Sequence, residues 1–213
     1  MTGSGLAARL WAENADLAGA ALAHPFVTGL AAGTLPRERF AGYVAQDAFF
    51  LEAFARAYAL GAAHSTDRSG LDAFADLLAG VREELRLHGS YAARWGIDLA
   101  QVQPLPATLA YTDFLLATAS LGGTALTCAA MVPCMRLYAH LGQSLAAGAD
   151  GAGDYAEWIT TYADPAFEEL AGTLESLLDT AAGPAVDTPA LRHAYRRAMQ
   201  LEVGFFDAAW AGA

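Results

Sequence analysis

Residues 36–63 read PRERFAGYVAQDAFFLEAFARAYALGAA, and this stretch decides the fold class. Phe40, Tyr43 and Phe50 recur in it at helical spacing, which places them on one face of an α-helix. Proline suits the first turn of a helix because its missing N–H needs no partner there, and Thr34 is a candidate N-cap. The stretch predicts one long helix with an unusually aromatic buried face.

The composition extends this prediction to the whole chain. Ala occurs 51 times and Leu 29 times among 213 residues, whereas Val and Ile together occur nine times, so helix formers dominate over strand formers. We expect an all-α fold in a single domain, residues 1–213, built as a bundle of seven or eight helices. The helices are expected at 6–23, 36–63, 69–96, 107–121, 124–142, 154–163, 165–179 and 188–210, with a turn at 29–36 and a loop at 146–153.

One stretch is long enough to test as a membrane span. Residues 114–135 carry no charge over 22 positions, about the length that crosses a bilayer. Gly122 and Gly123 interrupt the stretch, however, and several threonines and one serine make it partly polar. We therefore expect two buried helices around a glycine turn, and no contact with a membrane.

Charge and cysteine content limit the partners and the compartment. The net charge of −11 and the pI near 4.7 create a field that repels phosphate backbones, so no nucleic-acid partner is expected. Cys128 and Cys134 form no CxxC pattern, and two such thiols fit a reducing cytoplasm. Residues 1–10 lack the basic and apolar regions of a secretory signal. The predicted location is the cytoplasm.

Cys134 is the first candidate for chemistry. It follows Pro133 inside a helical pattern, where proline removes a backbone hydrogen bond and kinks the helix. Tyr138 lies four residues further on, so the thiol and the phenol share one helix face. A free cysteine is most often a small buried hydrophobic residue, and the pattern by itself leaves that interpretation open.

Two acidic residues interrupt apolar helix faces. Asp47 lies among the aromatic residues of the long helix, and Glu202 has phenylalanines three and four residues beyond it. A buried carboxylate costs several kcal/mol unless it is hydrogen-bonded or holds a cation. Two inward acids together with a thiol are typical of a functional pocket. Tyr111 and Tyr162 add phenols that suit either a pocket or a packed core.

Glu84 and His88 form a pair with the spacing of metal ligands on a helix. They lie four residues apart on a predicted helix, but no second such pair completes the pattern of a di-iron carboxylate site. We therefore expect a surface ion pair at these positions, and no metal ion or other cofactor in the protein.

Four motifs together resemble the TenA family, also called thiaminase II, from His24 to Trp210. HPFVTGLAAGTLPRERFAGYVAQD at 24–47 is similar to the family's opening signature, and VPCMRLYAHLG at 132–142 is similar to its cysteine motif. EWITTYADPAF at 157–167 and LEVGFF at 201–206 resemble its two later motifs. The first two are long enough to be specific.

The resemblance implies a haem-oxygenase-like fold that holds neither haem nor metal and assembles as a homotetramer. It implies an aminopyrimidine pocket in which Cys134 is the nucleophile, Glu202 the acid/base and Asp47 the carboxylate that binds the pyrimidine. The implied reaction is hydrolysis of 4-amino-5-aminomethyl-2-methylpyrimidine, or of thiamine, to the 5-hydroxymethyl pyrimidine in thiamine salvage. The family's pocket tyrosines match Tyr111, Tyr138 and Tyr162.

One position departs from the family's pattern. Where the family often has a tyrosine three residues after the aspartate, this chain has Phe50, so a hydroxyl is missing from the implied substrate-binding residues. This puts the preferred pyrimidine in doubt more than the reaction. Two other functions stay open: a non-catalytic small-molecule binder or regulator on the same fold, and a metal-dependent oxidase, which would need inward ligands that the sequence lacks.

Overall fold

The computed structural model describes residues 5–183 and 188–212, except for the side chains at positions 87, 91 and 100. Throughout these residues the regular structure is helical, with ten α-helices, two 3₁₀ segments and no β-strand. This confirms the all-α prediction. The α-helices are α1 (Leu6–Glu13), α2 (Ala15–Leu22), α3 (Pro25–Ala31), α4 (Arg37–His64), α5 (Arg68–Trp95), α6 (Pro106–Leu121), α7 (Thr124–Leu145), α8 (Ala156–Ala163), α9 (Pro165–Ala182) and α10 (Pro189–Ala211). The 3₁₀ segments are η1 (Leu99–Gln101) and η2 (Ala146–Tyr155).

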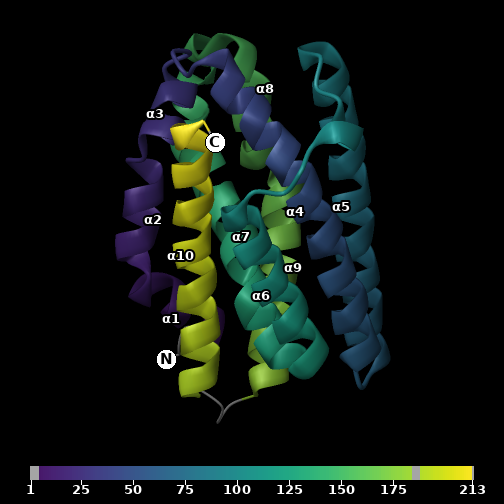
Figure 1. The fold of residues 1–213 in the computed structure, drawn as a ribbon. Coiled ribbons are helices and arrows are strands. Elements are labelled where there is room, and N and C mark those ends of the chain that lie inside the picture. Colours follow the sequence, from purple (N-terminus) through teal and green to yellow (C-terminus); the bar gives the residue numbers. More distant parts are fainter. Residues whose placement is uncertain (1–4, 184–187, 213) are drawn as a thin grey trace.

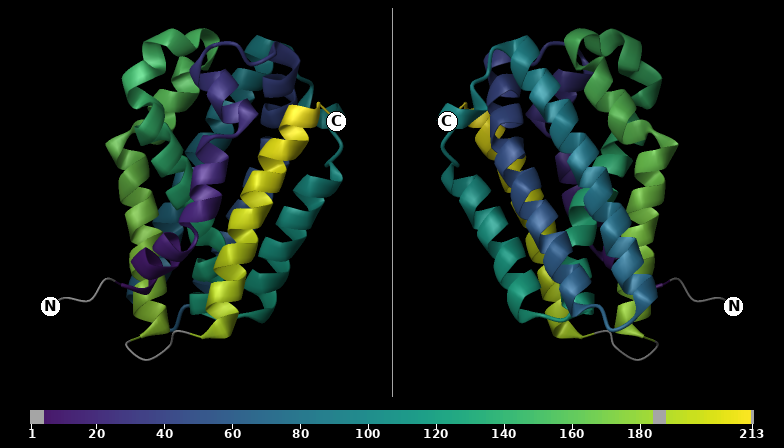
Figure 2. Two further views of the ribbon diagram at one scale, coloured as in Figure 1. Left: turned by 90° about the vertical axis from the view of Figure 1, so that its left-hand side faces the viewer. Right: turned by 90° about the vertical axis from the view of Figure 1, so that its right-hand side faces the viewer.

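The helices form one bundle around α7 (Figure 1). Helix α7 contacts α4, α6, α8, α9 and α10, and most of its residues are buried. On one side of the bundle α4 and α5 run next to each other (Figure 2). On the other side α2 and α3 lie beside α10, and α1 packs against α9. Side chains on the inward face of α7 are therefore surrounded by neighbouring helices.

The uncharged stretch at 114–135 forms two helices, as predicted. Helix α6 ends at Leu121, α7 begins at Thr124, and Gly122 and Gly123 connect them. No helix in residues 5–183 and 188–212 is both long enough and apolar enough to cross a membrane. The glycine pair thus separates two helices that pack against each other. Only α7 is largely buried, whereas α6 keeps an exposed face, so the expectation of two buried helices was wrong for α6.

The predicted helix number was too low at the N-terminal end. Residues 6–23 are two helices because the backbone breaks at Asn14, whose buried side chain donates to the Leu10 carbonyl at 2.8 Å. Arg196 of α10 donates to the Asn14 side chain at 3.1 Å. This contact from a distant helix stabilises a break that local sequence does not announce. A further short helix, α3, runs from Pro25 to Ala31, so the predicted turn at 29–36 was placed too early and its first residues are helical.

Two local predictions need correction as well. The predicted loop at 146–153 lies within the 3₁₀ segment η2. Helix α4 begins at Arg37 with Pro36 as its N-cap, so Thr34 does not cap it. The Thr34 hydroxyl instead donates to the Gly29 carbonyl at 3.5 Å. The long helix itself runs almost as predicted, to His64 instead of Ala63.

Glycine permits two close helix contacts next to the interior. A Cβ atom at Gly142 of α7 would lie 2.4 Å from the Tyr162 carbonyl carbon, and one at Gly61 of α4 would lie 2.6 Å from the Phe74 ring. Real Cβ atoms do not approach other atoms this closely. Gly142 therefore lets α8 bring Tyr162 against the central helix, and Gly61 lets α5 approach α4.

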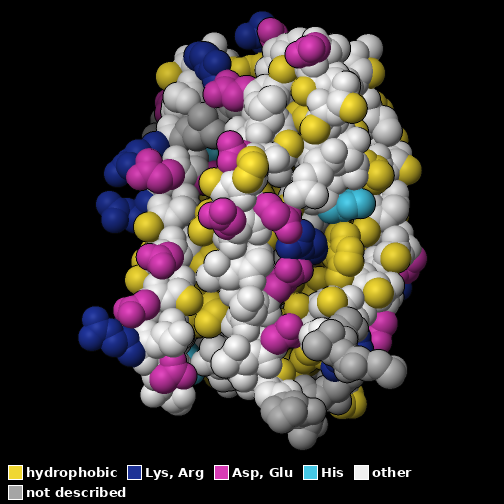
Figure 3. All heavy atoms as spheres, turned by 180° about the vertical axis from the view of Figure 1, so that it is seen from behind, with side chains coloured by type: hydrophobic (Ala, Val, Ile, Leu, Met, Phe, Trp, Pro, Cys, Tyr) yellow, Lys and Arg dark blue, Asp and Glu magenta, His cyan; other side chains and the backbone are white. Residues whose placement is uncertain are grey.

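The outer surface carries mixed charges. On the face shown in Figure 3, acidic side chains are spread over the helices and basic side chains form no continuous patch. An acidic surface without a basic stripe offers no electrostatic footprint for a nucleic acid on this face.

Candidate active site

Cys134 lies in the middle of the central helix. Pro133 is inside α7, and the helix continues for more than two turns beyond it. The proline ring occupies the position of one backbone N–H, which frees a carbonyl of the preceding turn. The Cys134 side chain is buried, with 9% of its surface exposed, and Tyr138 lies one turn further along the same face. The thiol is thus presented inside the bundle and away from bulk water.

The thiol is hydrogen-bonded to Glu202 of α10. Tyr111 of α6 donates to the Oε1 atom of the same carboxyl group at 2.6 Å. Both Glu202 and Tyr111 are almost fully buried. We call these three residues, Cys134, Glu202 and Tyr111, the nucleophile wall.

Burial controls the protonation of this wall. Desolvation raises the pKa of Glu202 to about 8, although the hydrogen bonds from Tyr111 and Cys134 oppose the shift. Desolvation, together with the Glu202 carboxyl group, raises the pKa of the Cys134 thiol well above its usual range. A carboxyl group that titrates near 8 can accept and release a proton close to neutral pH. The wall therefore has a proton acceptor in direct contact with its thiol.

Asp47 and His88 face each other across the α4–α5 contact. The His88 Nε2 atom lies 3.0 Å from the Asp47 Oδ2 atom, and each side chain is 5% exposed. Burial lowers the pKa of His88, but the charge and hydrogen bond of Asp47 outweigh it, so the pKa is raised. The expected surface ion pair between Glu84 and His88 was wrong. The partner of His88 is the buried carboxylate on the neighbouring helix.

Glu84 also points inward. Tyr162 of α8 donates to its Oε1 atom at 2.7 Å. Desolvation raises the pKa of Glu84 to about 7, and the charge of Asp47 adds to this shift, while His88 and the Tyr162 hydrogen bond oppose it. We call Asp47, Glu84 and His88 the carboxylate wall.

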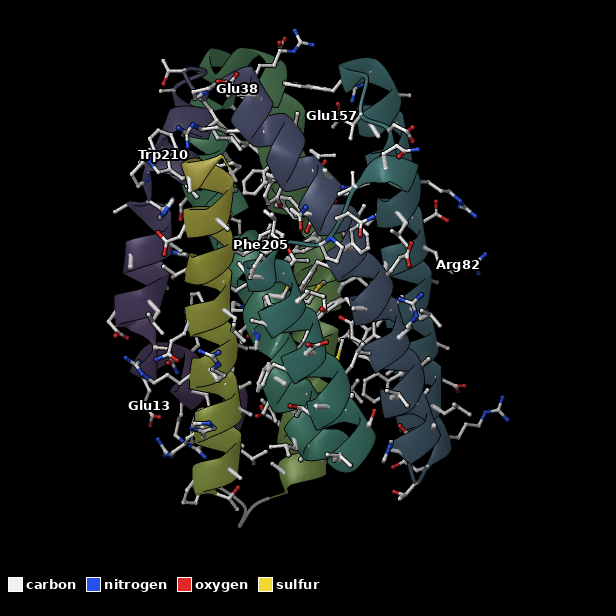
Figure 4. The ribbon with its side chains drawn as sticks, in the orientation of Figure 1. Glu13, Glu38, Arg82, Glu157, Phe205 and Trp210 are labelled. Carbon is white, nitrogen blue, oxygen red and sulfur yellow. The ribbon has the colours of Figure 1, made fainter. Side chains whose placement is uncertain are left out.

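Aromatic rings fill the space around the two walls. Tyr43 of α4 donates to the Tyr138 hydroxyl at 3.1 Å and accepts from the indole N–H of Trp158 at 3.3 Å. Phe205 of α10, labelled in Figure 4, packs between α10 and α4, with its ring 6.0 Å from that of Phe50. Flat rings at these separations form a rigid apolar surface on which a planar ligand can stack.

The two walls meet at one narrow cavity, whose free volume is only about 10 Å³. Asp47 and Glu84 line it from one side and Cys134 from the other. Phe50 also lines it, one helical turn beyond Asp47. Glu202 and Tyr111 do not line the cavity and lie behind the thiol. The remaining lining residues are Leu51, Phe54, Met135, Tyr138, Tyr162 and Phe167.

The structure thus brings together the residues singled out in the sequence. Cys134, Asp47, Tyr138, Tyr162 and Phe50 line one cavity. Glu202 contacts the thiol, and Tyr111 contacts Glu202. Within the described part of the chain, no group of three or more His, Cys, Asp and Glu side chains has an arrangement that could hold a metal ion.

Two polar residues of this site were not predicted to be there. Glu84 and His88 continue the inward stripe of α5, in which Phe74, Leu77 and Val81 are buried. The spacing 74, 77, 81, 84 and 88 is that of one helix face. The signal for an inward Glu84 and His88 was therefore present in the sequence as a continuation of the apolar period.

Comparison with known proteins places this site in a family. The model of the TENA/THI-4/PQQC family matches residues 11–212. The chain belongs to that family.

Among the solved structures, a TenA family transcription regulator from Silicibacter sp. TM1040 superposes with a TM-score of 0.90 at 32% identity, over 97% of both chains. A domain of unknown function from Shewanella denitrificans, with a haem-oxygenase-like fold, superposes with a TM-score of 0.77 at 15% identity, over 96% of this chain and 91% of that one. The second likeness shows that this family member has the haem-oxygenase-like fold.

Two curated proteins show the range of relatives. The aminopyrimidine aminohydrolase of Halalkalibacterium halodurans is 39% identical over 163 residues, which cover 73% of this chain and 72% of the relative. The bifunctional TH2 protein of Arabidopsis thaliana, a mitochondrial protein, is 40% identical over 210 residues, which cover 86% of this chain. The match covers only 34% of the length of the Arabidopsis protein.

Proposed function

We propose that this TenA family member hydrolyses an aminopyrimidine that carries an amine on its 5-methylene carbon. The proposal rests on the position of the Cys134 thiol. This thiol lines the same cavity as Asp47 and is hydrogen-bonded to the buried Glu202 carboxyl group. The similarity to an aminopyrimidine aminohydrolase supports the choice of substrate class. The product is the corresponding 5-hydroxymethyl pyrimidine, and the reaction serves thiamine salvage.

Asp47 binds the pyrimidine in this proposal. Its carboxylate accepts hydrogen bonds from the 4-amino group or a protonated ring nitrogen, and His88 holds the carboxylate in place from the other side. Tyr138, Tyr162 and Phe50 surround the ring. The ring is flat and apolar on its faces, so aromatic walls stack on it while the carboxylate fixes its rotation in the cavity.

The first chemical step is addition of sulfur to the ring. The Cys134 thiol gives its proton to the Glu202 carboxylate, and the sulfur forms a bond to C6 of the pyrimidine. Aromaticity is lost, and the 4-amino nitrogen becomes part of an enamine with C4 and C5. The enamine pushes its electron pair toward the methylene carbon and breaks the bond to the amine, which takes the proton from Glu202. Positive charge develops on the 4-amino nitrogen beside Asp47, which stabilises it.

Water then replaces the amine. It adds to the exocyclic methylene while Glu202 accepts one of its protons. The electron pair returns to the ring, the carbon–sulfur bond breaks, and the thiolate takes the proton back from Glu202. The net reaction consumes one water and releases one amine, with the thiol, the carboxylate and the aromatic ring restored.

The direct test is ammonia release from 4-amino-5-aminomethyl-2-methylpyrimidine by the purified chain. We expect one ammonia and one hydroxymethyl pyrimidine per substrate consumed, measured by a coupled ammonia assay and by mass spectrometry. The Cys134→Ser variant should bind the pyrimidine without releasing ammonia. Binding without turnover by the unaltered chain would instead identify a small-molecule binder on the same fold.

We also propose that the protein works as a homotetramer in the cytoplasm. This rests on the resemblance of its motifs to the TenA family and on its two free thiols, both of them buried. Light scattering coupled to gel filtration measures the mass directly. A tetramer has about four times the 22.2 kDa of the chain, and a mass of one or two chains would contradict the proposal.

A further inference from the structure

Three buried aromatic side chains form a series of hydrogen bonds that ends at the cavity at Cys134. The indole N–H of Trp158 on α8 donates to the Tyr43 hydroxyl group at 3.3 Å, and Tyr43 on α4 donates to the Tyr138 hydroxyl group on α7 at 3.1 Å. All three side chains are at most 5% exposed. Tyr138 lines the cavity, whereas Tyr43 and Trp158 do not. We call these three residues the donor series.

The chemistry of the indole group fixes the direction of the donor series. An indole nitrogen donates and cannot accept, whereas a phenol can do both but has only one proton. The Tyr43 oxygen therefore accepts from Trp158. If Tyr138 donated to Tyr43, the Tyr43 proton would be left without an acceptor in the closed interior, which is unfavourable. Donation from Tyr43 to Tyr138 avoids this loss.

The proton that remains is that of Tyr138. Its hydroxyl group donates to no acceptor among residues 5–183 and 188–212. Burial raises the pKa of Tyr138 well above its usual range, so the group keeps this proton at neutral pH. Since Tyr138 lines the cavity, the proton is directed to a molecule that enters it. An acceptor atom on the ligand is the partner that would complete the donor series.

The positions of Asp47 and Cys134 indicate which ligand atom this is. In the function proposed above, Asp47 binds the 4-amino side of the pyrimidine, and the Cys134 sulfur adds to C6. Tyr138 lies on the same helix as Cys134, one turn further on. The ring nitrogen N1 is bonded to C6 and lies opposite the carbon that carries the 4-amino group. N1 is therefore the acceptor nearest to the sulfur and farthest from Asp47.

We propose that Trp158 and Tyr43 are positioning residues that hold the Tyr138 hydroxyl group as a hydrogen-bond donor to N1 of the pyrimidine. When sulfur adds to C6, the electron pair of the C6–N1 double bond moves onto N1, and the donor stabilises the charge that develops there. The pair returns to the ring when the carbon–sulfur bond breaks. A hydroxyl group that accepts a hydrogen bond is itself a stronger donor, so Trp158 and Tyr43 act on the substrate without touching it. This inference rests on the function proposed above, because it assigns a partner to one atom of that substrate.

The test compares two ligands that differ at N1. The first is the aminomethyl pyrimidine. The second is 2-amino-3-aminomethyl-6-methylpyridine, which has a C–H group in place of N1 and keeps the ring nitrogen next to the amino group. Calorimetric titrations in the Cys134→Ser background give both dissociation constants without hydrolysis. We call the dissociation constant of the pyridine divided by that of the pyrimidine the N1 preference.

Changes in the donor series should lower the N1 preference in order of their distance from the ligand. Tyr138→Phe should lower it about tenfold, because the donor is lost. Tyr43→Phe should lower it about 3- to 5-fold, because the Tyr138 hydroxyl group is no longer held in one orientation. Trp158→Phe should lower it about twofold, because the donor series is shortened. A purely structural role would weaken both ligands equally and leave the N1 preference unchanged.

Tyr195→Phe is the matched control. Tyr195 of α10 is also fully buried, its hydroxyl group has no partner among the described residues, and it does not line the cavity. It should leave the N1 preference unchanged. Tyr43→Phe keeps the ring, so it tests the donor series even if Trp158→Phe does not fold. The proposal is overturned if the pyrimidine does not bind, if Tyr43→Phe leaves the N1 preference unchanged, or if Tyr195→Phe lowers it equally. Failure of the proposed function shows separately, as absence of ammonia release by the unaltered chain.

Discussion

The nucleophile wall and the carboxylate wall bury similar groups under different electrostatic conditions. In the nucleophile wall, Glu202 contacts a thiol and a phenol, and no cationic side chain of the described residues contributes to its pKa. In the carboxylate wall, Asp47 meets the imidazole of His88. Burial without a cation raises the pKa of Glu202 to about 8, whereas the partnership with Asp47 raises the pKa of His88 despite its burial.

This difference in protonation suits the two walls to different roles. A carboxyl group that is easily protonated near neutral pH can pass a proton between a thiol and a leaving amine. A carboxylate paired with an imidazole is suited to holding a ligand in a fixed orientation. The walls therefore predict that changes on one side affect turnover, while changes on the other affect binding.

Replacing the nucleophile should have the largest effect. Cys134→Ser is expected to lower kcat at least ~10³-fold, because the covalent step is lost while the stacking surfaces remain. The dissociation constant of the pyrimidine, measured by calorimetry, should change little. Cys128→Ala is the control, since Cys128 lies on the same helix and does not line the cavity at Cys134. Near-normal turnover by Cys134→Ser would exclude the thiol mechanism.

Glu202→Gln tests the proton relay. We expect kcat to fall by roughly 10²-fold or more, the scale of a lost acid/base group. In the unaltered protein kcat/KM should rise as pH increases toward 8, because only the ionised carboxylate accepts the thiol proton and the pKa of Glu202 is raised to about 8. The variant should lose this dependence. A variant that keeps the same pH profile would show that another group accepts the proton.

The buried Glu202 also predicts how stability depends on pH. Its pKa is about 8 in the folded chain and near 4.5 when unfolded, so between these values the folded state binds more protons. The free energy of unfolding should therefore fall as pH rises from about 4.5 to 8. Thermal unfolding followed by circular dichroism measures this, and the fall should be smaller in Glu202→Gln. An equal fall in the variant would assign the effect to other groups.

His88→Gln examines the carboxylate wall. Gln keeps a donor for Asp47 but loses the charge, so KM for the pyrimidine should rise by about tenfold with a smaller change in kcat. The His88 pKa is raised in the folded state. The stabilising contribution of its charge is thus complete below pH 6.5 and is lost as pH rises through the raised pKa. The variant's loss of thermal stability should accordingly be larger at pH 6 than at pH 9. A fall in kcat as large as that of Glu202→Gln would contradict the assignment of binding to the carboxylate wall and turnover to the nucleophile wall.

Phe50→Tyr should have the smallest effect. Phe50 lines the cavity at Cys134 one turn beyond Asp47, and a tyrosine there adds one polar contact worth about 0.5–1.5 kcal/mol. We expect the ratio of kcat/KM values for the aminomethyl pyrimidine and thiamine to change several-fold, with little change in melting temperature because the ring volume is kept. A ratio that stays constant would show that the hydroxyl group does not reach the substrate.

Much of the framework followed from the sequence alone. The alanine and leucine content and the helical period of 36–63 predicted an all-α fold, and the glycine pair at 122–123 predicted two helices in the uncharged stretch. These features are local, because helix propensity and backbone breaks depend on neighbouring residues. The break at Asn14 was not predictable in this way, since a side chain from α10 contributes to it.

The site shows the same division. The sequence alone singled out Cys134, Asp47 and Glu202 as polar groups on apolar helix faces, because their own neighbours reveal an inward position. Only the tertiary structure decided their partners: Glu202 with the thiol, and Asp47 with His88. Such pairs join residues far apart in the chain, and their protonation depends on desolvation by the whole bundle. A helix period gives the direction of a side chain, whereas the packing of neighbouring helices determines what it meets.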